Sequence, residues 1–469
     1  MIIEYKDIKM RFSILLIALV TCCLQLTNAQ LLKLDSTELN VTVLAENLDT
    51  PWEILWGPDD HLWITEREGL VSRIDPASGN VKVLLDISET VDETTENGLL
   101  GMALHPNFEH PDSQFVYLVY TYFTSARKER LARYTFDSDT LINEMILLDG
   151  IPASHYHTGS RVLILPDRTI LMSTGDAGST SNSQDTASLA GKFLRMNLDG
   201  SVPDDNPIPG SYIWSYGHRN PQGLVLASNG MLYSSEHGPS NDDEINIITK
   251  HGNYGWPEVM GFCDLTTEQA FCGANNVVEP IIAWTPTLAV CGLDYYDHDA
   301  IPEWKNSLLL ASLKQDDLRV LKLNEAGDSI ISVDIYFNNE YGRLRDVCVS
   351  PEGAIYFATS NRDGRGNDGF PQETDDKIIG LSNEQFSVPT GGVEYHETSK
   401  LRFYPNPVGN TIYLDHDEVQ RYRIYDLSSR LIRHGRSERT IDVSQLHQGL
   451  YILEIHEGNI IRKGKFLKK

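Results

Sequence analysis

Short apolar runs, each preceded by a cluster of turn-forming residues, recur along most of this chain. The four clearest copies cover residues 58–65, 166–173, 228–235 and 351–358. Two looser copies start at Pro106 and Pro302, and successive starts lie 48 to 74 residues apart. Apolar runs bounded by Pro, Gly, Asn and Asp predict short strands. Repeats on this scale are typical of a β-propeller, whose small sheets bury their faces against one another, so the pattern predicts an all-β fold with a six-bladed β-propeller.

The two ends of the repeated region predict strands as well. Residues 39–45 and 376–381 are apolar runs of strand length. We expect these two segments to share one blade, because this closes the ring and removes the exposed edges of an open sheet.

A second unit follows the repeats. Residues 388–400 are polar and contain Gly and Pro, which is typical of a linker. Residues 401–469 alternate between strand patterns and turns, which predicts a small C-terminal β-sandwich domain. The formal charge also changes here, from −32 over residues 30–400 to +4 over the last segment. We therefore place the propeller domain at residues 30–387.

The first 29 residues have the pattern of a secretory signal peptide. Lys9 and Arg11 precede an apolar run over residues 12–26, and residues 27–29 offer a small-residue cleavage site. A lipoprotein signal at Cys22 is the alternative, but the residue before it fits that pattern poorly. The run is shorter than the ~20 residues of a spanning helix, so no stable membrane span is expected. A body this acidic repels phosphate backbones, which argues against nucleic acid as a partner.

Four cysteines lie outside the signal segment. An even number in an exported protein favours disulfides. Cys263 and Cys272 bracket one loop and are expected to pair, which leaves Cys291 to pair with Cys348. Four buried free thiols are the alternative, and the spacing does not suit a zinc site.

Polar clusters follow or separate the predicted strands, where propellers place ligand-binding groups. A single histidine in such a loop is more often a surface residue, and we assign His155 to that class. Two strings are long enough to be specific: Gly-His-Arg-Asn-Pro-Gln-Gly at residues 217–223 and Gly-Pro-Ser-Asn-Asp-Asp-Glu-Ile-Asn at residues 238–246. In order and context, the clusters resemble the soluble quinoprotein sugar dehydrogenases, which use pyrroloquinoline quinone (PQQ). The resemblance covers about residues 40–385 and is nearer to the aldose sugar dehydrogenase branch.

The resemblance implies a PQQ- and calcium-dependent oxidation of small-molecule aldoses at the anomeric carbon to lactones. His157 matches the general base, and neutral imidazole suits that role near neutral pH. Asp176 matches the carboxylate that orients it, and Arg219 completes the catalytic set. PQQ carries three carboxylates, so its pocket needs cations. The implied cofactor-binding residues are Glu96, Arg161, Arg219, Asn220, Thr287, Lys314, Arg343, Arg345 and Asn361.

Calcium is implied at two places. Backbone oxygens of Gly238 and Pro239 match the ligands of an ion that polarises the quinone carbonyl accepting hydride. Glu244 and the carbonyl oxygen of Tyr254 resemble a second, structural site, since oxygen ligands suit calcium. Without the neighbouring motif, residues 242–244 would be read as an acidic turn.

The chain departs from the family pattern in several positions. Glu96 replaces Gln, Tyr156 replaces Asp, and Asn361 stands where an acidic residue is expected. The family's order Ser-Gly-Arg appears here as Gly-Ser-Arg at residues 159–161, and the region 262–285 is short. These changes argue against a strict preference for glucose, so broad aldose oxidation is expected.

The C-terminal unit resembles the sorting domain of the type IX secretion system. The resemblance rests on Tyr-Pro-Asn-Pro-Val-Gly-Asn at residues 404–410, the strands after it and Lys-Gly-Lys-Phe-Leu-Lys-Lys at residues 463–469. It implies the type IX machinery as a partner, and a secreted or cell-surface protein of a Gram-negative bacterium that passes the periplasm.

Two other function classes stay open. A calcium-dependent lactonase propeller would hold a metal on the ring axis with side-chain carboxylates. A non-catalytic extracellular recognition propeller would lack the base and the cofactor cations, which are present here. For the dehydrogenase, electrons would pass to a periplasmic or external acceptor of unknown identity.

Overall fold

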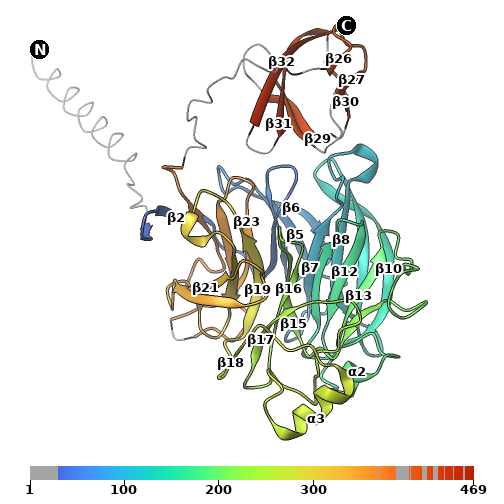
Figure 1. Cartoon of the computed structure of the whole chain (residues 1–469), viewed down its shortest axis with the longest axis vertical. Helices are drawn as coiled ribbons and strands as arrows, with labels where there is room; N and C mark the ends of the chain where they lie inside the picture. Colours follow the sequence, from blue (N-terminus) through green and yellow to red (C-terminus); the bar gives the residue numbers. More distant parts are fainter. Residues whose placement is uncertain are drawn as a thin grey trace, which may run out of the picture. The chain divides into compact units, whose positions relative to one another are not determined.

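The chain divides into two compact units, residues 1–385 and residues 386–469, each treated separately below (Figure 1). The signal peptide predicted at residues 1–29 and the linker predicted at residues 388–400 lie outside the described residues. The computed structural model describes residues 30–386 except 368, and residues 401–469 except 402, 415–419, 426–430, 438, 447 and 458–459.

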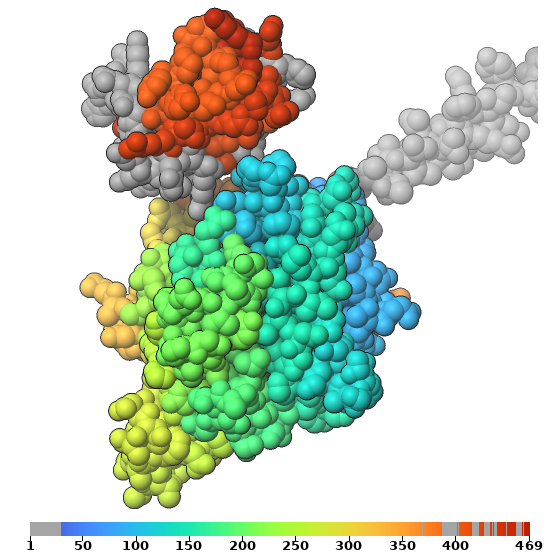
Figure 2. Space-filling model, turned by 90° about the vertical axis from the view of Figure 1, so that its right-hand side faces the viewer, coloured from blue at the N-terminus to red at the C-terminus, as the bar shows by residue number. Residues whose placement is uncertain are grey.

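Six antiparallel sheets form the described part of the first unit, and in five of them four strands lie side by side in chain order. The first sheet contains β3 (Pro51–Trp56), β4 (Leu62–Glu66), β5 (Leu70–Ile74) and β6 (Val81–Asp86). The second contains β7 (Leu99–Leu104), β8 (Phe115–Phe123), β9 (Arg127–Asp137) and β10 (Thr140–Pro152). The third contains β11 (Gly159–Ile164), β12 (Thr169–Thr174), β13 (Lys192–Asn197) and β14 (Ile213–Tyr216). Figure 2 shows the second and third sheets, cyan to green, side by side on one surface.

The remaining sheets continue this order, and the last one joins the two ends of the repeated region. The fourth contains β15 (Pro221–Leu226), β16 (Leu232–Glu236), β17 (Asp243–Ile247) and β18 (Ile282–Trp284). The fifth contains β19 (Val290–Tyr296), β20 (Ser307–Ser312), β21 (Asp317–Leu323) and β22 (Ile330–Tyr336). The sixth contains β1 (Gln30–Lys33), β2 (Glu38–Ala45), β25 (Ile378–Ser382), β24 (Ile355–Thr359) and β23 (Leu344–Val349).

The ring of sheets closes through the pairing that the sequence predicts. Strand β2 pairs with β25, with Val41 opposite Leu381. One strand of each sheet contacts its counterpart in the next sheet, which gives a closed cycle. The strands in this cycle are β3, β7, β11, β15, β19, β23 and again β3. The all-β prediction is therefore confirmed.

The repeated sequence pattern corresponds to one turn, which joins the first and second strands of a sheet. Its third residue has positive φ in the four clear copies, at Asp60 (58°), Arg168 (66°), Gly230 (84°) and Gly353 (82°). In each copy this residue donates its N–H to the carbonyl three positions earlier. Gly, Asn and Asp tolerate this left-handed conformation most easily, which explains why such residues mark the repeat.

Apolar clusters fill the spaces between neighbouring sheets. One cluster joins Trp63 of β4 with Val116 and Leu118 of β8, and another joins Tyr117 of β8 with Ile170 of β12. Strands such as β4 and β20 are buried along their whole length, as expected for strands covered on both faces.

The cysteine predictions have mixed outcomes. Cys263 and Cys272 form a disulfide, but Cys291 and Cys348 are buried free thiols, so the prediction that they pair is wrong. The Sγ atom of Cys291 lies 3.1 Å from Nη1 of Arg345, whereas Cys348 packs in an apolar cluster between two sheets. The two side chains therefore face different surroundings.

The helices are few and short. Within the described residues, α2 (Ser181–Gln184) and α3 (Thr266–Asn275) lie at the same end of the first unit (Figure 1). The 3₁₀ turns are Pro111–Ser113 and Pro302–Trp304. The sequence analysis missed α3 because only Glu268 of this helix is buried, so it has no apolar stripe.

The second unit contains two sheets among its described residues. One contains β26 (Phe403–Tyr404), β27 (Thr411–Leu414) and β30 (Thr440–Asp442). The other contains β29 (Leu431–Ser437), β28 (Gln420–Tyr425), β31 (Gly449–Glu457) and β32 (Ile460–Lys468). One apolar core, including Ile412, Ile424, Leu453 and Phe466, connects them. Across both units, no helix in the described ranges has the length and apolarity needed to cross a membrane.

Candidate functional site

The strand order brings most of the predicted site residues to one end of the ring. In a four-stranded antiparallel sheet, the loop before the first strand and the loop between the second and third strands lie at the same end of the strands. Most of the candidate residues fall in these two loop classes, but Arg161, Arg345, Glu244 and Tyr254 do not. The repeated turns join the first and second strands, so they lie at the opposite end. Members of the candidate set in these loops are Glu96, His157, Asp176, Arg219, Asn220, Gly238, Pro239, Thr287, Lys314, Arg343 and Asn361.

His157, which is partly exposed, pairs with the buried Asp176 within this loop cluster. Nδ1 of His157 lies 2.7 Å from Oδ1 of Asp176, which is fully buried. His157 has a φ of 62°, and a Cβ atom on Gly175 would lie 2.0 Å from the carbonyl oxygen of His157. Only glycine permits this close approach. Because a carboxylate only accepts hydrogen bonds, we assign the ring proton to Nδ1, which leaves Nε2 as an acceptor.

Asp176 accepts two further hydrogen bonds. The N–H of Gly178 donates to Oδ1 at 2.7 Å, and Nε1 of Trp256 donates to Oδ2 at 2.9 Å. A buried carboxylate is costly unless donors surround it. These contacts therefore hold an ionised carboxylate in one orientation behind the imidazole.

Glu96 links two loops around His157. Its Oε2 accepts the N–H of His157 at 3.0 Å, and its Oε1 accepts from Nη1 of Arg365 at 3.0 Å. Burial raises the pKa of Glu96, but the His157 N–H and Arg365 stabilise the charged form and leave the pKa below its ordinary value. A glutamine at this position would lack the ion pair with Arg365.

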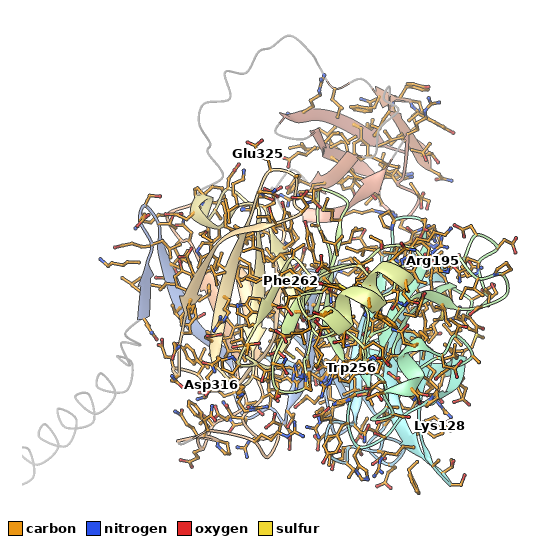
Figure 3. All side chains as sticks on the ribbon, turned by 60° about the horizontal axis from the view of Figure 1, so that its bottom comes forward. Lys128, Arg195, Trp256, Phe262, Asp316 and Glu325 are labelled. Carbon is orange, nitrogen blue, oxygen red and sulfur yellow. A yellow bond between two sulfur atoms is a disulfide. The ribbon has the colours of Figure 1, made fainter. Side chains whose placement is uncertain are left out.

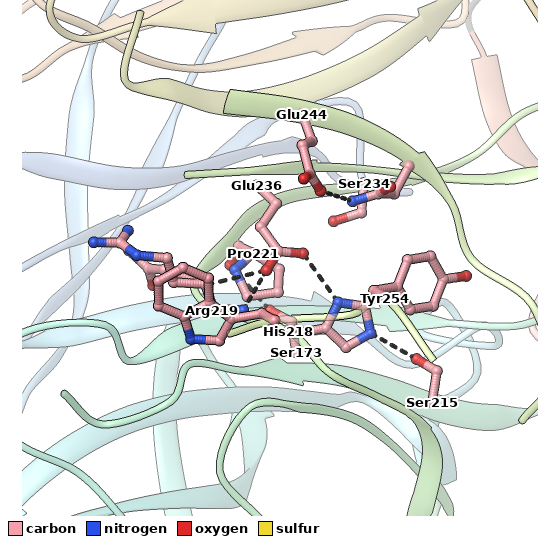
Figure 4. Close-up of polar contacts among 12 residues, drawn as sticks. Ser173, Ser215, His218, Arg219, Pro221, Ser234, Glu236, Glu244 and Tyr254 are labelled. Carbon is pink, nitrogen blue, oxygen red and sulfur yellow. Dashed lines mark hydrogen bonds and ion pairs between the residues drawn. The ribbon is translucent and has the colours of Figure 1, made fainter. Parts of the chain in front are cut away.

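Glu236 organises the loop that carries Arg219 and Asn220 (Figure 4). Oε1 of Glu236 accepts the N–H of Arg219 and, at 3.3 Å, that of Asn220. Oε2 of Glu236 lies 3.0 Å from Nδ1 of His218, whose ring stacks on Tyr254 at a centroid distance of 4.4 Å. The loop therefore presents the Arg219 side chain from a fixed backbone.

The predicted cofactor cations differ in how far the protein satisfies them. Arg343 donates from Nε and Nη2 to Asp363 and from Nη1 to a backbone carbonyl. Lys314 donates to the hydroxyl of Thr287 at 3.2 Å. Arg345 meets Gln222 Oε1 at 3.1 Å.

Three buried nitrogens of the cluster have no hydrogen-bond partner among the described residues: Nε of Arg219, Nε of Arg345 and Nε2 of His237. Burial lowers the pKa of His237, and the positive charges of Arg219 and Arg345 lower it further. Buried polar atoms are nearly always hydrogen-bonded in native structures. The cluster can therefore accept an anionic or carbonyl-bearing ligand.

Arg161 lies in different surroundings. Its Nη1 contacts Glu53 at 2.7 Å and Asp346 at 2.6 Å, and its guanidinium carbon lies 4.2 Å from the ring centre of Trp52. These partners come from β3 and β23, so Arg161 connects first strands of the ring. Its predicted role in cofactor binding stays a prediction.

The four residues predicted to bind metal line one pocket, together with Glu236 and Trp256. They are Gly238, Pro239, Glu244 and Tyr254. Burial raises the pKa of Glu244 to about 8, and the charge of Glu236 adds to this. In the part of the chain that is described, no three His, Cys, Asp or Glu side chains form a metal cluster, so backbone oxygens would have to complete any site here.

Sequence reasoning missed several residues of this cluster. His237 immediately precedes the motif at residues 238–246 but received no role. Arg67 follows β4 and donates to the carbonyl oxygens of Asn97 and Glu93; burial lowers its pKa, and the charge of Arg345 adds to this. Trp256 meets Asp176 across 80 residues of sequence, and no local pattern could have indicated that contact.

Comparison with known proteins places these features in context. A profile described as Glucose / Sorbosone dehydrogenase matches residues 48–367, and one described as Secretion system C-terminal sorting domain matches residues 402–469. Quinoprotein glucose dehydrogenase B of Acinetobacter calcoaceticus is 32% identical, over 72% of this chain and 89% of that protein. Aldose sugar dehydrogenase YliI of Escherichia coli (strain K12) is 29% identical, over 70% and 91%. The PQQ-bound aldose sugar dehydrogenase from Streptomyces coelicolor superposes with a TM-score of 0.63 at 31% identity, covering 73% of this chain and 98% of that chain.

Proposed function

We propose that this protein oxidises aldose sugars with PQQ, starting from the fact that the chain belongs to the glucose/sorbosone dehydrogenase family. The observation that carries the proposal is the His157–Asp176 pair in the same loop cluster as three buried, unpartnered nitrogens, of Arg219, Arg345 and His237. Together they supply a base and an anion-binding surface in one loop cluster. The differences from the family pattern favour aldoses in general over glucose alone.

The donor chemistry of the site fits PQQ. A tricarboxylate needs several charge-assisted donors, and the unpartnered nitrogens of Arg219 and Arg345 are of that kind. Arg219, Arg345 and His237 would bind the cofactor through these atoms, with Lys314 and Thr287 beside them. Glu96, Asn220, Arg343 and Asn361 contribute to the same loop cluster. When bound, PQQ supplies the acceptor for the two electrons that leave the sugar as hydride.

His157 provides the proton acceptor. Its Nδ1–H donates to Asp176, so Nε2 is free to take the proton of the anomeric hydroxyl. Asp176 stabilises the imidazolium that forms, because the two charges meet at hydrogen-bond distance in a buried site. Loss of the hydroxyl proton assists loss of the anomeric hydrogen as hydride, and the sugar leaves as a lactone.

Calcium is the second proposed cofactor. The carbonyl oxygens of Gly238 and Pro239 would bind an ion that polarises the cofactor, and Glu244 with the Tyr254 carbonyl would bind a structural ion. The support is that Glu236 and Glu244 stand opposite each other on β16 and β17 and line the same pocket, because a cation between two carboxylates would relieve their repulsion.

We further interpret the cycle of six sheets as six propeller blades and the two sheets of the second unit as a small sandwich. The match to a secretion sorting domain supports export by the type IX machinery to the cell surface or the medium of a Gram-negative bacterium. Under this proposal the signal segment is removed first, during passage into the periplasm.

Reconstitution tests the proposal. Purified apo-protein is titrated with PQQ, with and without calcium, and dye reduction is measured across a panel of aldoses. We expect PQQ- and calcium-dependent activity that chelation abolishes. His157→Ala should retain PQQ binding and lose about 10³-fold in turnover, within the range for removal of a general base. Failure to bind PQQ contradicts the proposal, and hydrolysis of lactones without PQQ would instead support a lactonase.

A further inference from the structure

Trp256 contacts the two parts of the site that the proposed reaction needs. It lies in the loop between β17 and α3, at the end of the first unit that carries α3 (Figure 3). Its indole Nε1 donates to Oδ2 of Asp176 at 2.9 Å. The guanidinium carbon of Arg219 lies 5.3 Å from the centre of its ring, within the range of a cation–π contact.

The backbone of Trp256 is held in place from two directions. Its N–H donates to the carbonyl oxygen of Gly217 at 3.1 Å. Its carbonyl oxygen accepts from Nε2 of Gln184, at the end of α2, at 2.8 Å. The indole therefore reaches Asp176 from a backbone that is fixed to the third sheet, which also carries His157.

The contact with Asp176 restricts the orientation of that carboxylate. Oδ1 meets His157 and Gly178, and Oδ2 meets Trp256. Without the indole donor, Oδ2 is left buried without this hydrogen bond, and the carboxylate gains freedom to rotate. Rotation would weaken the bond that keeps the proton of His157 on Nδ1.

We propose that Trp256 is a positioning residue: its indole N–H fixes Asp176, which keeps His157 in the tautomer with a free Nε2, while its ring face orients Arg219. This inference rests on the proposed function for its catalytic consequence. The arrangement of Trp256, Asp176 and His157 can be tested without PQQ or sugar.

Two substitutions separate the two contacts of Trp256. Trp256→Phe removes the N–H and keeps an aromatic face toward Arg219, whereas Trp256→Leu removes both. Trp214→Phe is the matched control, because the indole Nε1 of Trp214 has no hydrogen-bond partner in the described residues. Nitrogen-15 NMR of the apo-protein reports the His157 tautomer, with its signals assigned by their loss in His157→Gln.

We expect wild type and Trp214→Phe to show one tautomer protonated at Nδ1, and Trp256→Phe to show a mixture. In reconstituted protein, Trp256→Phe should lower kcat about tenfold, in the range for removal of a supporting hydrogen bond, with KM and PQQ affinity changed less than twofold. Trp256→Leu should also weaken PQQ binding. An unchanged His157 tautomer in Trp256→Phe would overturn the inference. A changed tautomer in a protein that never oxidises sugars would overturn only the proposed function.

Discussion

Arg161 and Arg345 are both deeply buried, at 3% and 7% exposure, but their partners differ. All three guanidinium nitrogens of Arg161 meet acceptors, including the carboxylates of Glu53 and Asp346. Arg345 meets only neutral groups at Nη1, and its Nε has no hydrogen-bond partner among the described residues. Burial alone therefore does not separate the two arginines. Their partners do, because the protein satisfies all three nitrogens of Arg161 and leaves Nε of Arg345 unused among the described residues.

Both arginines are predicted from the sequence to lie in the cofactor site, but their surroundings differ. Arg161 stands within β11 and reaches carboxylates of β3 and β23, which makes it a connection between distant sheets. Arg345 also stands on a first strand, β23, but its guanidinium reaches Gln222 and Cys291 and keeps one donor unused. Position on a first strand is common to both, and only the surrounding charges separate them.

The largest expected effect comes from Arg161→Met. It leaves Glu53 and Asp346 buried without their cation, and breaking such a pair costs about 3–5 kcal/mol. Urea unfolding of the apo-protein measures the loss. The triple variant Arg161→Met, Glu53→Gln, Asp346→Asn should recover part of it. An unchanged unfolding midpoint together with weakened PQQ binding would show that Arg161 binds the cofactor. The proposed difference between Arg161 and Arg345 would then be wrong.

A smaller effect is expected from Arg345→Met. Removal of one charge-assisted donor should weaken PQQ binding by about ten- to a hundredfold, which corresponds to about 1.5–3 kcal/mol for a hydrogen bond to a charged group. The free energy of unfolding of the apo-protein should stay the same or increase, because no buried carboxylate loses its partner. Fluorescence titration with PQQ and urea unfolding measure the two quantities. A loss of stability as large as that of Arg161→Met would show that the two arginines play the same part.

The smallest effect per pH unit concerns Glu129, a third kind of buried charge. This residue is 1% exposed, and the hydroxyl of Ser160 donates to it. Burial raises its pKa to about 8. Between the ordinary carboxyl pKa and about 8, the folded protein keeps a proton that the unfolded chain has released. Stability therefore falls as pH rises, by up to about 1.4 kcal/mol per pH unit.

Glu129→Gln should remove that component of the pH dependence. Urea midpoints of wild type and variant are compared from pH 5 to pH 8, so that other titrating groups cancel. The variant should lose less stability than wild type over this range. If the urea midpoints of wild type and Glu129→Gln change with pH in parallel, Glu129 has an ordinary carboxyl pKa. Burial without a cation would then not have raised the pKa of this carboxyl.

Much of the fold was predictable because its signals are local. The repeated turn needs a residue with positive φ at one position, and the residue types Asp60, Gly230 and Gly353 indicate such a turn in the sequence. The pairing of β2 with β25 follows from apolar runs at the two ends of the repeats. The helix α3 was not predicted, because a helix with a single buried residue has no periodic pattern of apolar positions.

The sequence predicts a set of candidate site residues, and their contacts become visible only in the structure. Strand alternation alone sends the loops with His157, Asp176 and Arg219 to one end of the ring. The pairing of Cys291 with Cys348 was wrong, because the sequence does not state which way each side chain faces when two strands become neighbours.

The sequence by itself determined the sheets, their order, the loops that carry chemistry and the family, since turns, strand lengths and motifs depend on residues close together in the chain. Tertiary structure alone decided which buried charges are neutralised and which stay available. Arg161 meets Asp346 across 185 residues, and Trp256 meets Asp176 across 80. Electrostatic energy and hydrogen bonding depend on distance in space, and closure of the ring sets those distances.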